Sequence, residues 1–276
     1  MGTRDEAWVA GSPCWVDLVV DDTAEAKNFY GGLFGWDCQD QPSQAGGYLM
    51  CLLQGRPTAG IGPKPEGVGM PAVWSTYLAT DDADETAAKI KAGGGSLMME
   101  PFDVLDAGRM AFGFDPAGAA FGIWQARAHS GSQIVNEAGA LTWNECMSRD
   151  YAGAKDFYAS VFGYEYDEMG DGENFNYSLI KVAGGGVGGL GQLGAETPEE
   201  VPAHWMTYFG TVDTDSTVER AESLGAKVQM AARDSEYGRL AVLAGPQGEV
   251  FSVIEVGSSG DAVSGESTRG AELPEP

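Results

Sequence analysis

The apolar positions at the start of the chain switch from an extended run to a helical period. The run Cys14–Val20 indicates a strand. Asp22 follows as a helix-capping residue, and Gly35 is suited to end the helix. The sequence therefore predicts a strand followed by a helix that buries one face. The apolar residues of that face are Ala26, Phe29, Tyr30 and Leu33.

The chain repeats this pattern. Segments 22–35 and 71–77 return about 130 residues later as segments 150–163 and 202–208. The repeat predicts two homologous domains. They span residues 11–126 and 140–256, with an N-terminal extension (1–10), a linker (127–139) and a disordered acidic tail (257–276).

Each half divides again into a strand, a helix and three further strands. In the first quarter, apolar runs place two of these later strands at 48–53 and 58–61. The fold class expected is α+β, with four βαβββ modules. The modules span residues 11–62, 70–126, 140–191 and 202–256.

Two local motifs recur in this frame. The helices end in Leu-Phe-Gly35 or Val-Phe-Gly163, and the turn Asp115–Gly118 precedes a final strand. Over residues 11–256 the chain resembles the vicinal oxygen chelate superfamily, which includes glyoxalase I, bleomycin-resistance proteins and extradiol dioxygenases. Within it, the chain is similar to tandem glyoxalase-like proteins of actinobacteria. The resemblance implies two glyoxalase-like domains whose curved mixed sheets enclose cup-shaped cavities.

The resemblance also gives positions for metal ligands, on the first and last strands of the modules. None of the residues found there is a usable ligand for a hard or borderline divalent metal. The chain has only two histidines, His129 and His204. We therefore expect no metal and no other cofactor. The six positions are Trp15, Ser75, Gly122, Trp143, Met206 and Ser252.

An acid lies near a tryptophan at matching places in the two halves. Strand alternation puts Trp15 and Asp17 on the face away from the helix, and Trp143 and Glu145 likewise. An acid between tryptophans tends to have a raised pKa, which suits proton transfer, so Asp17 and Glu145 are candidate catalytic residues. The alternative is a core tryptophan beside an exposed charge.

Further side chains are candidates for ligand binding. Arg109 and Arg239 begin equivalent strands and carry a rigid fork for an oxyanion, although structural salt bridges are the alternative. Trp15 and Trp143 are expected to bind the ligand as an aromatic floor. Four tyrosines and a methionine also fall on strands that line the cups. They are Tyr48, Tyr77, Tyr177, Tyr208 and Met206.

Charge and cysteine content limit the partners and the compartment. The net charge is −25, which disfavours nucleic acid and anionic membrane surfaces. No apolar run is long enough to span a membrane. The four cysteines show no paired spacing, which predicts reduced thiols and a cytoplasmic protein. They are Cys14, Cys38, Cys51 and Cys146.

Several functions remain open at this point. The first is metal-independent binding of a small aromatic or conjugated molecule, as in drug or toxin sequestration, with at most two ligands per chain. The second is a metal-independent isomerase, lyase or cyclase that uses Glu145 or Asp17 as general base, with an arginine and a tyrosine at the oxyanion. A metal-dependent glyoxalase or dioxygenase is a further alternative, and cups filled by their own side chains would indicate a scaffold. A monomer with an internal pseudo-dimer or a homodimer is expected.

Overall fold

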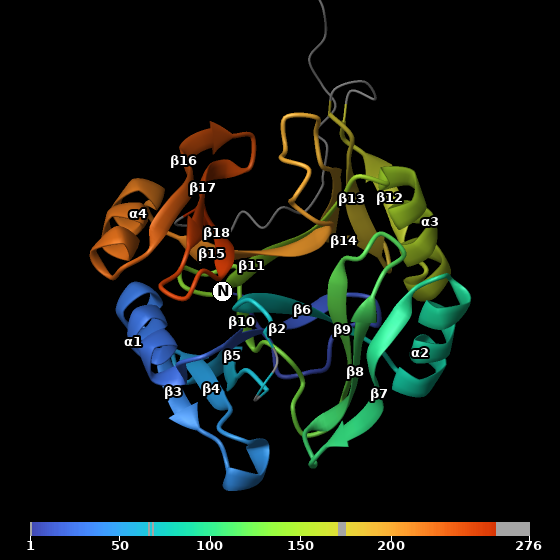
Figure 1. Ribbon diagram of the computed structural model, residues 1–276, viewed down its shortest axis with the longest axis horizontal. Coiled ribbons are helices and arrows are strands. Elements are labelled where there is room, and N and C mark those ends of the chain that lie inside the picture. The colour runs from blue at the N-terminus through green and yellow to red at the C-terminus, as the bar shows by residue number, and fades with distance from the viewer. Residues whose placement is uncertain (1, 66, 68, 171–174, 258–276) are drawn as a thin grey trace, which may run out of the picture.

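The computed structural model describes residues 2–65, 67, 69–170 and 175–257, so the predicted disordered tail lies outside the described residues except for Gly257. Two mixed sheets lie side by side, one from each half of the chain (Figure 1). No helix in this part of the chain is long and apolar enough to cross a membrane. The helices are α1 (Thr23–Phe34), α2 (Ala83–Ala92), α3 (Tyr151–Phe162) and α4 (Thr214–Ser223).

The first sheet joins the first two modules through its central antiparallel strands, β2 and β6. Its strand order is β3-β4-β5-β2-β6-β9-β8-β7. A short 3₁₀ helix, Ser43–Ala45, connects β3 to β4. The strands are β2 (Pro13–Val20), β3 (Asp37–Asp40), β4 (Leu49–Leu53), β5 (Arg56–Pro63), β6 (Val73–Ala79), β7 (Ser96–Val104), β8 (Gly108–Phe114) and β9 (Ala120–Ala126).

The second sheet repeats this order for the last two modules, as β12-β13-β14-β11-β15-β18-β17-β16. Two short strands extend it: β1 (Gly2–Thr3) pairs with β10 (Ile134–Val135), which pairs with β11. The remaining strands are β11 (Leu141–Ser148), β12 (Glu165–Glu168), β13 (Tyr177–Val182), β14 (Gly185–Gln192), β15 (His204–Thr211), β16 (Lys227–Ser235), β17 (Gly238–Ala244) and β18 (Val250–Glu255). The fold class is therefore α+β, as predicted.

The helices cover only one face of each sheet, and these faces meet. Helix α1 lies beside α4, and α2 lies beside α3 (Figure 1). One core cluster accordingly joins Val16 and Phe29 of the first module to Phe251 of the fourth. The other joins Phe121 of the second module to Phe157 of the third. The two halves therefore share their cores, and the opposite face of each sheet is left for a site.

Two buried tyrosines link the halves by matching hydrogen bonds. Tyr30 donates to Glu249 Oε1 at 3.0 Å, and Tyr158 donates to Asp115 Oδ2 at 3.2 Å. Each hydroxyl also accepts from an indole, Tyr30 from Trp74 at 3.0 Å and Tyr158 from the matching tryptophan at 2.8 Å. These bonds satisfy polar groups that would be costly to bury unpaired.

The carboxylates of the two links come from different places in the turn before the last strand. Asp115 opens the first turn, and the matching residue of the second turn is Gly245. A Cβ atom on Gly245 would lie 2.1 Å from Glu249 Oε1. The longer Glu249 side chain thus reaches back from the other end of the turn into the space that an aspartate would use.

Helix starts and stops follow the sequence prediction. The side chain of Asp22 accepts from the amides of Ala24 and Glu25, and Asp82, Asp150 and Asp213 cap the other helices in the same manner. Gly35 ends α1 with φ 75°, a left-handed conformation that favours glycine.

The prediction of four reduced cysteines is wrong for two of them. Cys38 and Cys51 are register partners on β3 and β4 and form a disulfide. Cys14 and Cys146 are free and buried. Sequence spacing missed the pair because it depends on strand register, and β3 itself has only one buried residue to reveal it. Disulfides are typical of oxidising compartments, so the disulfide does not favour the predicted cytoplasmic location.

Candidate functional site

Glu145 is the centre of a hydrogen-bonded cluster on the helix-free face of the second sheet. It lies on β11, the middle of the sheet. Its Oε1 accepts from Tyr208 at 2.5 Å and its Oε2 accepts from Tyr177 at 3.1 Å. The Tyr177 hydroxyl in turn accepts from the Trp143 indole at 3.1 Å. The structure thus brings Tyr177 and Tyr208 together with Trp143 and Glu145, which the sequence had placed on one strand face. Met206 is the register partner of Glu145 on the same face.

Burial and hydrogen bonding act in opposite directions on this carboxyl group. Burial raises the pKa of Glu145, while the hydrogen bonds from Tyr208 and Tyr177 lower it by less. Burial also raises the pKa values of both tyrosines, so their hydroxyls stay protonated and donate. A carboxyl group held this way can accept a further hydrogen bond or a proton.

Glycines in the neighbouring strand make room for this cluster. A Cβ atom on Gly189 would lie 1.9 Å from the Tyr177 hydroxyl, and one on Gly191 would lie 2.8 Å from Met147 Sδ. Residues 185–191 of the glycine-rich run thus lie in β14, and side chains of the site lie over them. We find no phosphate-binding turn there.

The first domain holds a similar but less connected cluster. Tyr77 donates to Asp17 Oδ2 at 3.1 Å, and the Trp15 indole donates to the Tyr48 hydroxyl at 3.0 Å. Asp17 is one methylene shorter than glutamate, and its buried Oδ1 has no hydrogen-bond partner. Burial raises the pKa of Asp17 to about 7, and the hydrogen bond from Tyr77 lowers it by a smaller amount.

The linker covers this first cluster. The ring of His129 packs edge-on against Trp15, with the two ring centroids 4.4 Å apart. Its centroid lies 5.6 Å from that of Trp124. Burial lowers the pKa of His129 to about 4, so the ring is neutral near pH 7. Trp15, Tyr77 and Trp124 are 4%, 6% and 7% exposed and form one apolar cluster, against which Trp8 also packs.

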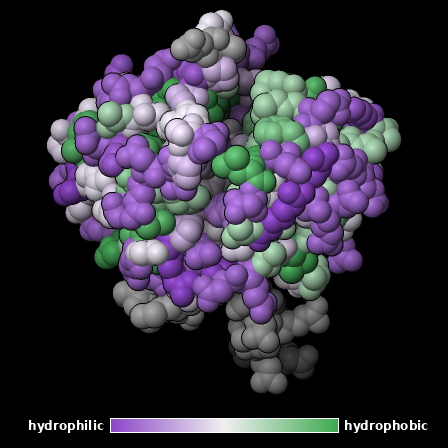
Figure 2. Space-filling model, turned by 90° about the horizontal axis from the view of Figure 1, so that it is seen from below, coloured by the Kyte–Doolittle hydropathy of each residue, from purple (hydrophilic) through white to green (hydrophobic). Residues whose placement is uncertain are grey.

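Three of the matching residues of the second domain are more accessible. Trp143, Met206 and Tyr208 are half-buried, whereas their counterparts Trp15, Ser75 and Tyr77 are buried. Tyr177 and its counterpart Tyr48 are both half-buried. The strands opposite them carry Val242 and Ile254, where the first domain has Phe112 and Trp124. The first domain, seen from below, shows hydrophobic residues in separate groups among hydrophilic ones (Figure 2). The two helix-free faces are therefore filled to different degrees.

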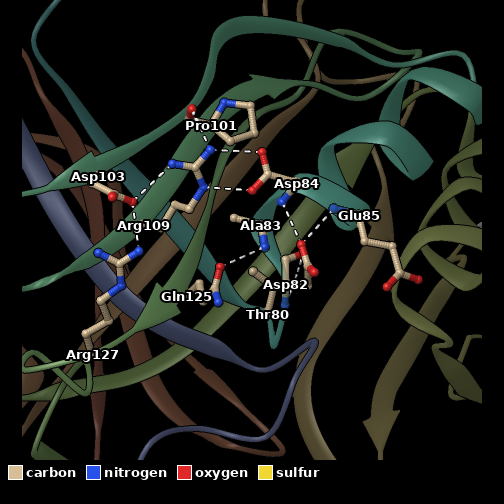
Figure 3. Close-up of polar contacts among 10 residues, drawn as sticks. All are labelled: Thr80, Asp82, Ala83, Asp84, Glu85, Pro101, Asp103, Arg109, Gln125 and Arg127. Atoms are coloured by element: carbon tan, nitrogen blue, oxygen red, sulfur yellow. Dashed lines mark hydrogen bonds and ion pairs between the residues drawn. The ribbon is translucent and has the colours of Figure 1, made fainter.

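The two predicted arginines lie elsewhere, which corrects their predicted place beside the acids. Arg109 forms ion pairs with Asp84 at the start of α2 and with Asp103 on β7, at 2.8 and 3.0 Å (Figure 3). Arg239 pairs with Asp215 and Asp234 at 2.7 and 2.9 Å. They share the strand faces of Ala111 and Ala241, which belong to the core under the helices. The salt-bridge alternative thus describes both arginines.

The donor chemistry does not fit a divalent metal. In the residues that the structure describes, no group of three or more His, Cys, Asp or Glu side chains lies close enough to hold one. The positions that the resemblance assigned to ligands on the second sheet carry an indole, a thioether and a hydroxyl, from Trp143, Met206 and Ser252. We therefore derive no step through a metal.

Comparison with known proteins supports the fold assignment. Residues 13–123 match the family model described as the glyoxalase/bleomycin resistance protein/dioxygenase superfamily, and residues 145–254 match a glyoxalase-like domain. A solved Mn(II)-bound glyoxalase from Novosphingobium aromaticivorans is 15% identical, with a TM-score of 0.62 over 90% of this chain and 83% of that chain. The 2,3-dioxygenase LapB from Pseudomonas sp. KL28 is 14% identical, with a TM-score of 0.61 over 90% of this chain and 93% of that chain.

Sequence relatives span nearly the whole chain. The protein named "Putative glyoxylase CFP32" from Mycobacterium tuberculosis is 43% identical over 89% of this chain and 95% of its own length. "Anthracycline biosynthesis protein DnrV" from Streptomyces peucetius is 35% identical over 92% of this chain and 97% of its own length. With a matching model in each half and relatives of this similarity, the chain belongs to the glyoxalase/bleomycin resistance protein/dioxygenase superfamily.

Proposed function

We propose that the second domain binds a small aromatic or conjugated molecule on its helix-free face, without a metal, with Glu145 as the polar anchor. The observation that carries this proposal is the Glu145 carboxylate, which is held by two tyrosine hydroxyls beside half-buried aromatic rings. Aromatic faces bind flat molecules, and few fixed polar groups are needed to orient them.

The chemistry of the anchor limits the ligand. A carboxylate accepts hydrogen bonds, so the ligand carries a hydroxyl or amine donor. The net charge of −25 favours neutral or cationic molecules over anions. The names of DnrV and the similarly named DauV of Streptomyces sp. strain C5, both anthracycline biosynthesis proteins, are consistent with an aromatic ligand.

The proposed stoichiometry is one ligand per chain. The first-domain counterparts Trp15 and Tyr77 are already buried, with the linker residue His129 packed on Trp15. These contacts support the filled-cup alternative for the first domain, while the second domain keeps half-buried aromatic side chains. Retention of the bound molecule without turnover would correspond to drug or toxin sequestration.

Proton transfer is a second candidate function, favoured by the pKa of Glu145. Burial raises this pKa. The Tyr208 and Tyr177 hydroxyls donate to the carboxylate, and once Glu145 has taken up a proton each is released to donate to a developing oxyanion instead. Glu145 would remove a proton from a carbon next to a carbonyl group, as in a metal-independent isomerase, lyase or cyclase. Consumption of the ligand by the wild-type protein, but not by Glu145→Gln, would favour this candidate over sequestration.

Equilibrium dialysis of EDTA-treated protein against 2-naphthol tests the proposal. The dissociation constant should rise at least about tenfold in Glu145→Gln, because a charge-assisted hydrogen bond is lost. The matched variant Asp17→Asn should bind like the wild type, and the saturated alcohol decahydro-2-naphthol should bind at least about tenfold more weakly than 2-naphthol. Equal binding by wild type and Glu145→Gln, or binding only after a divalent metal is restored, would contradict the proposal.

A further inference from the structure

Three large hydrophobic side chains are exposed where the two ends of the second sheet approach each other. Met169, Phe175 and Tyr237 are 42%, 56% and 46% exposed. Met169 follows β12 and Phe175 precedes β13, at one end of the strand order, while Tyr237 lies in the turn between β16 and β17 at the other end. The Tyr237 hydroxyl lies 3.6 Å from Met169 Sδ, so the curved sheet brings its ends together.

These side chains continue directly from the Glu145 cluster. Phe175 and Tyr177 are two residues apart, and their rings are parallel within 6° with centroids 5.8 Å apart. Tyr177 is also one of the two tyrosines that donate to Glu145. The Met169 amide donates to the Tyr177 carbonyl at 2.9 Å. A row of side chains thus leads from the buried carboxylate to the surface.

The first domain lacks all three side chains. The amide of Gln41 donates to the Tyr48 carbonyl at 3.0 Å, which identifies Gln41 as the counterpart of Met169. The same alignment places Gly46 opposite Phe175 and Ala107 opposite Tyr237. Among the described residues, these three exposed side chains therefore have no counterparts in the first domain, although its turn between β7 and β8 exposes Leu105. Exposed apolar side chains that gather beside a site are a common mark of ligand contact.

We propose that Met169, Phe175 and Tyr237, here called the apolar rim, bind the outer rings of an extended fused-ring ligand whose polar end is held by Glu145. This inference rests on the proposed function and adds the size of the ligand to it. The ring centroids of Tyr177 and Phe175 are 5.8 Å apart. A ligand of two or three fused rings that is held at Glu145 therefore covers more of the apolar rim than a single ring does.

A ligand series of increasing ring number tests this inference. Phenol, 2-naphthol and 2-anthrol present one hydroxyl on one, two and three rings. For the wild type, we expect the dissociation constant measured by equilibrium dialysis to fall about tenfold from phenol to 2-naphthol, and again to 2-anthrol. In the double variant F175A/Y237A the constant for 2-anthrol should rise about tenfold, while that for phenol stays within about twofold.

Two controls separate local from general effects. Phe102→Ala removes an exposed phenylalanine of the first domain and should change no constant by more than about twofold. Phe175→Leu keeps an apolar side chain and should lose less affinity for 2-anthrol than Phe175→Ala, which guards against a folding defect in the double variant. Each variant is compared with the wild type by its thermal unfolding midpoint.

The outcomes distinguish this inference from the proposed function. If all three ligands lose affinity equally in the rim variants, or if none changes, the rim inference is wrong, while a loss in Glu145→Gln still supports the anchor. If no ligand binds the wild type, both are wrong. A ring-dependent loss confined to the rim variants supports the inference.

Discussion

Each domain carries an acid, a tryptophan and two tyrosines at matching positions, but these side chains are packed differently in the two domains. In the second domain, Glu145 accepts from two tyrosines and the neighbouring rings are half-buried. In the first domain, Asp17 accepts from Tyr77 alone and the linker residue His129 packs on Trp15. One methylene in the acid and one covering segment thus separate two copies of an ancestral pattern. The comparison teaches that duplication preserves the scaffold more strictly than the site.

The matched substitutions Trp15→Phe and Trp143→Phe should show the largest difference in stability between the two domains. Both remove an indole hydrogen bond to a tyrosine, but only Trp15 is fully packed, at 4% exposure. We expect Trp15→Phe to lower the free energy of unfolding by about 2–4 kcal/mol and Trp143→Phe by about 1 kcal/mol. Urea denaturation measures both, and equal losses would show that the two faces are equally packed.

The links between the halves should respond alike, because they are built alike. Tyr30→Phe and Tyr158→Phe each remove one hydrogen bond from a buried carboxylate and leave a buried indole N–H without its partner. Each should cost about 1–3 kcal/mol of unfolding free energy. The same denaturation experiment tests this, with Tyr237→Phe on the surface as control. A loss in only one of the two would mean that the halves are held together asymmetrically.

The buried Asp17 carboxyl group should make the stability of the protein depend on pH. Its folded pKa is raised to about 7, so the stability that the neutral acid contributes is present below about pH 4 and is lost as the pH rises through 7. Relative to the wild type, Asp17→Asn should therefore gain about 1–2 kcal/mol between pH 5 and pH 8. The folded pKa of His129 is lowered to about 4, so its contribution to stability is lost as the pH falls. His129 is present in the wild type and in Asp17→Asn, so its effect cancels in the difference between them.

Thermal unfolding across this pH range provides the check. We compare the unfolding midpoints of the wild type and Asp17→Asn at each pH. If the difference between them does not grow above pH 5, the pKa of Asp17 is not raised in the folded state.

The sequence predicts those features that local pattern controls. The duplication, the Asp22 cap and the placing of Trp15 and Asp17 on the face away from the helix all match the structure. The clustering of Glu145 with two tyrosines also follows, because strand alternation fixes which side chains share a face.

Features that depend on contacts between distant segments were not predictable. The covering of Trp15 by His129 joins a strand to the linker, and no periodicity marks it. The shared cores arise because an amphipathic helix can bury its face against either half, and composition does not decide which. The ion pairs of Arg109 with Asp84 and Asp103 were not predictable either. An arginine that follows a glycine at the start of a strand has the same sequence pattern whether it binds a ligand or forms a salt bridge.

The number of 2-naphthol molecules bound per chain at saturation tests the central claim most directly. Equilibrium dialysis of the wild type, Glu145→Gln and Asp17→Asn gives this number in one experiment. The account predicts one molecule for the wild type, one for Asp17→Asn, and a binding that is lost or at least about tenfold weaker for Glu145→Gln. Two molecules per wild-type chain, or a loss in Asp17→Asn alone, would contradict it.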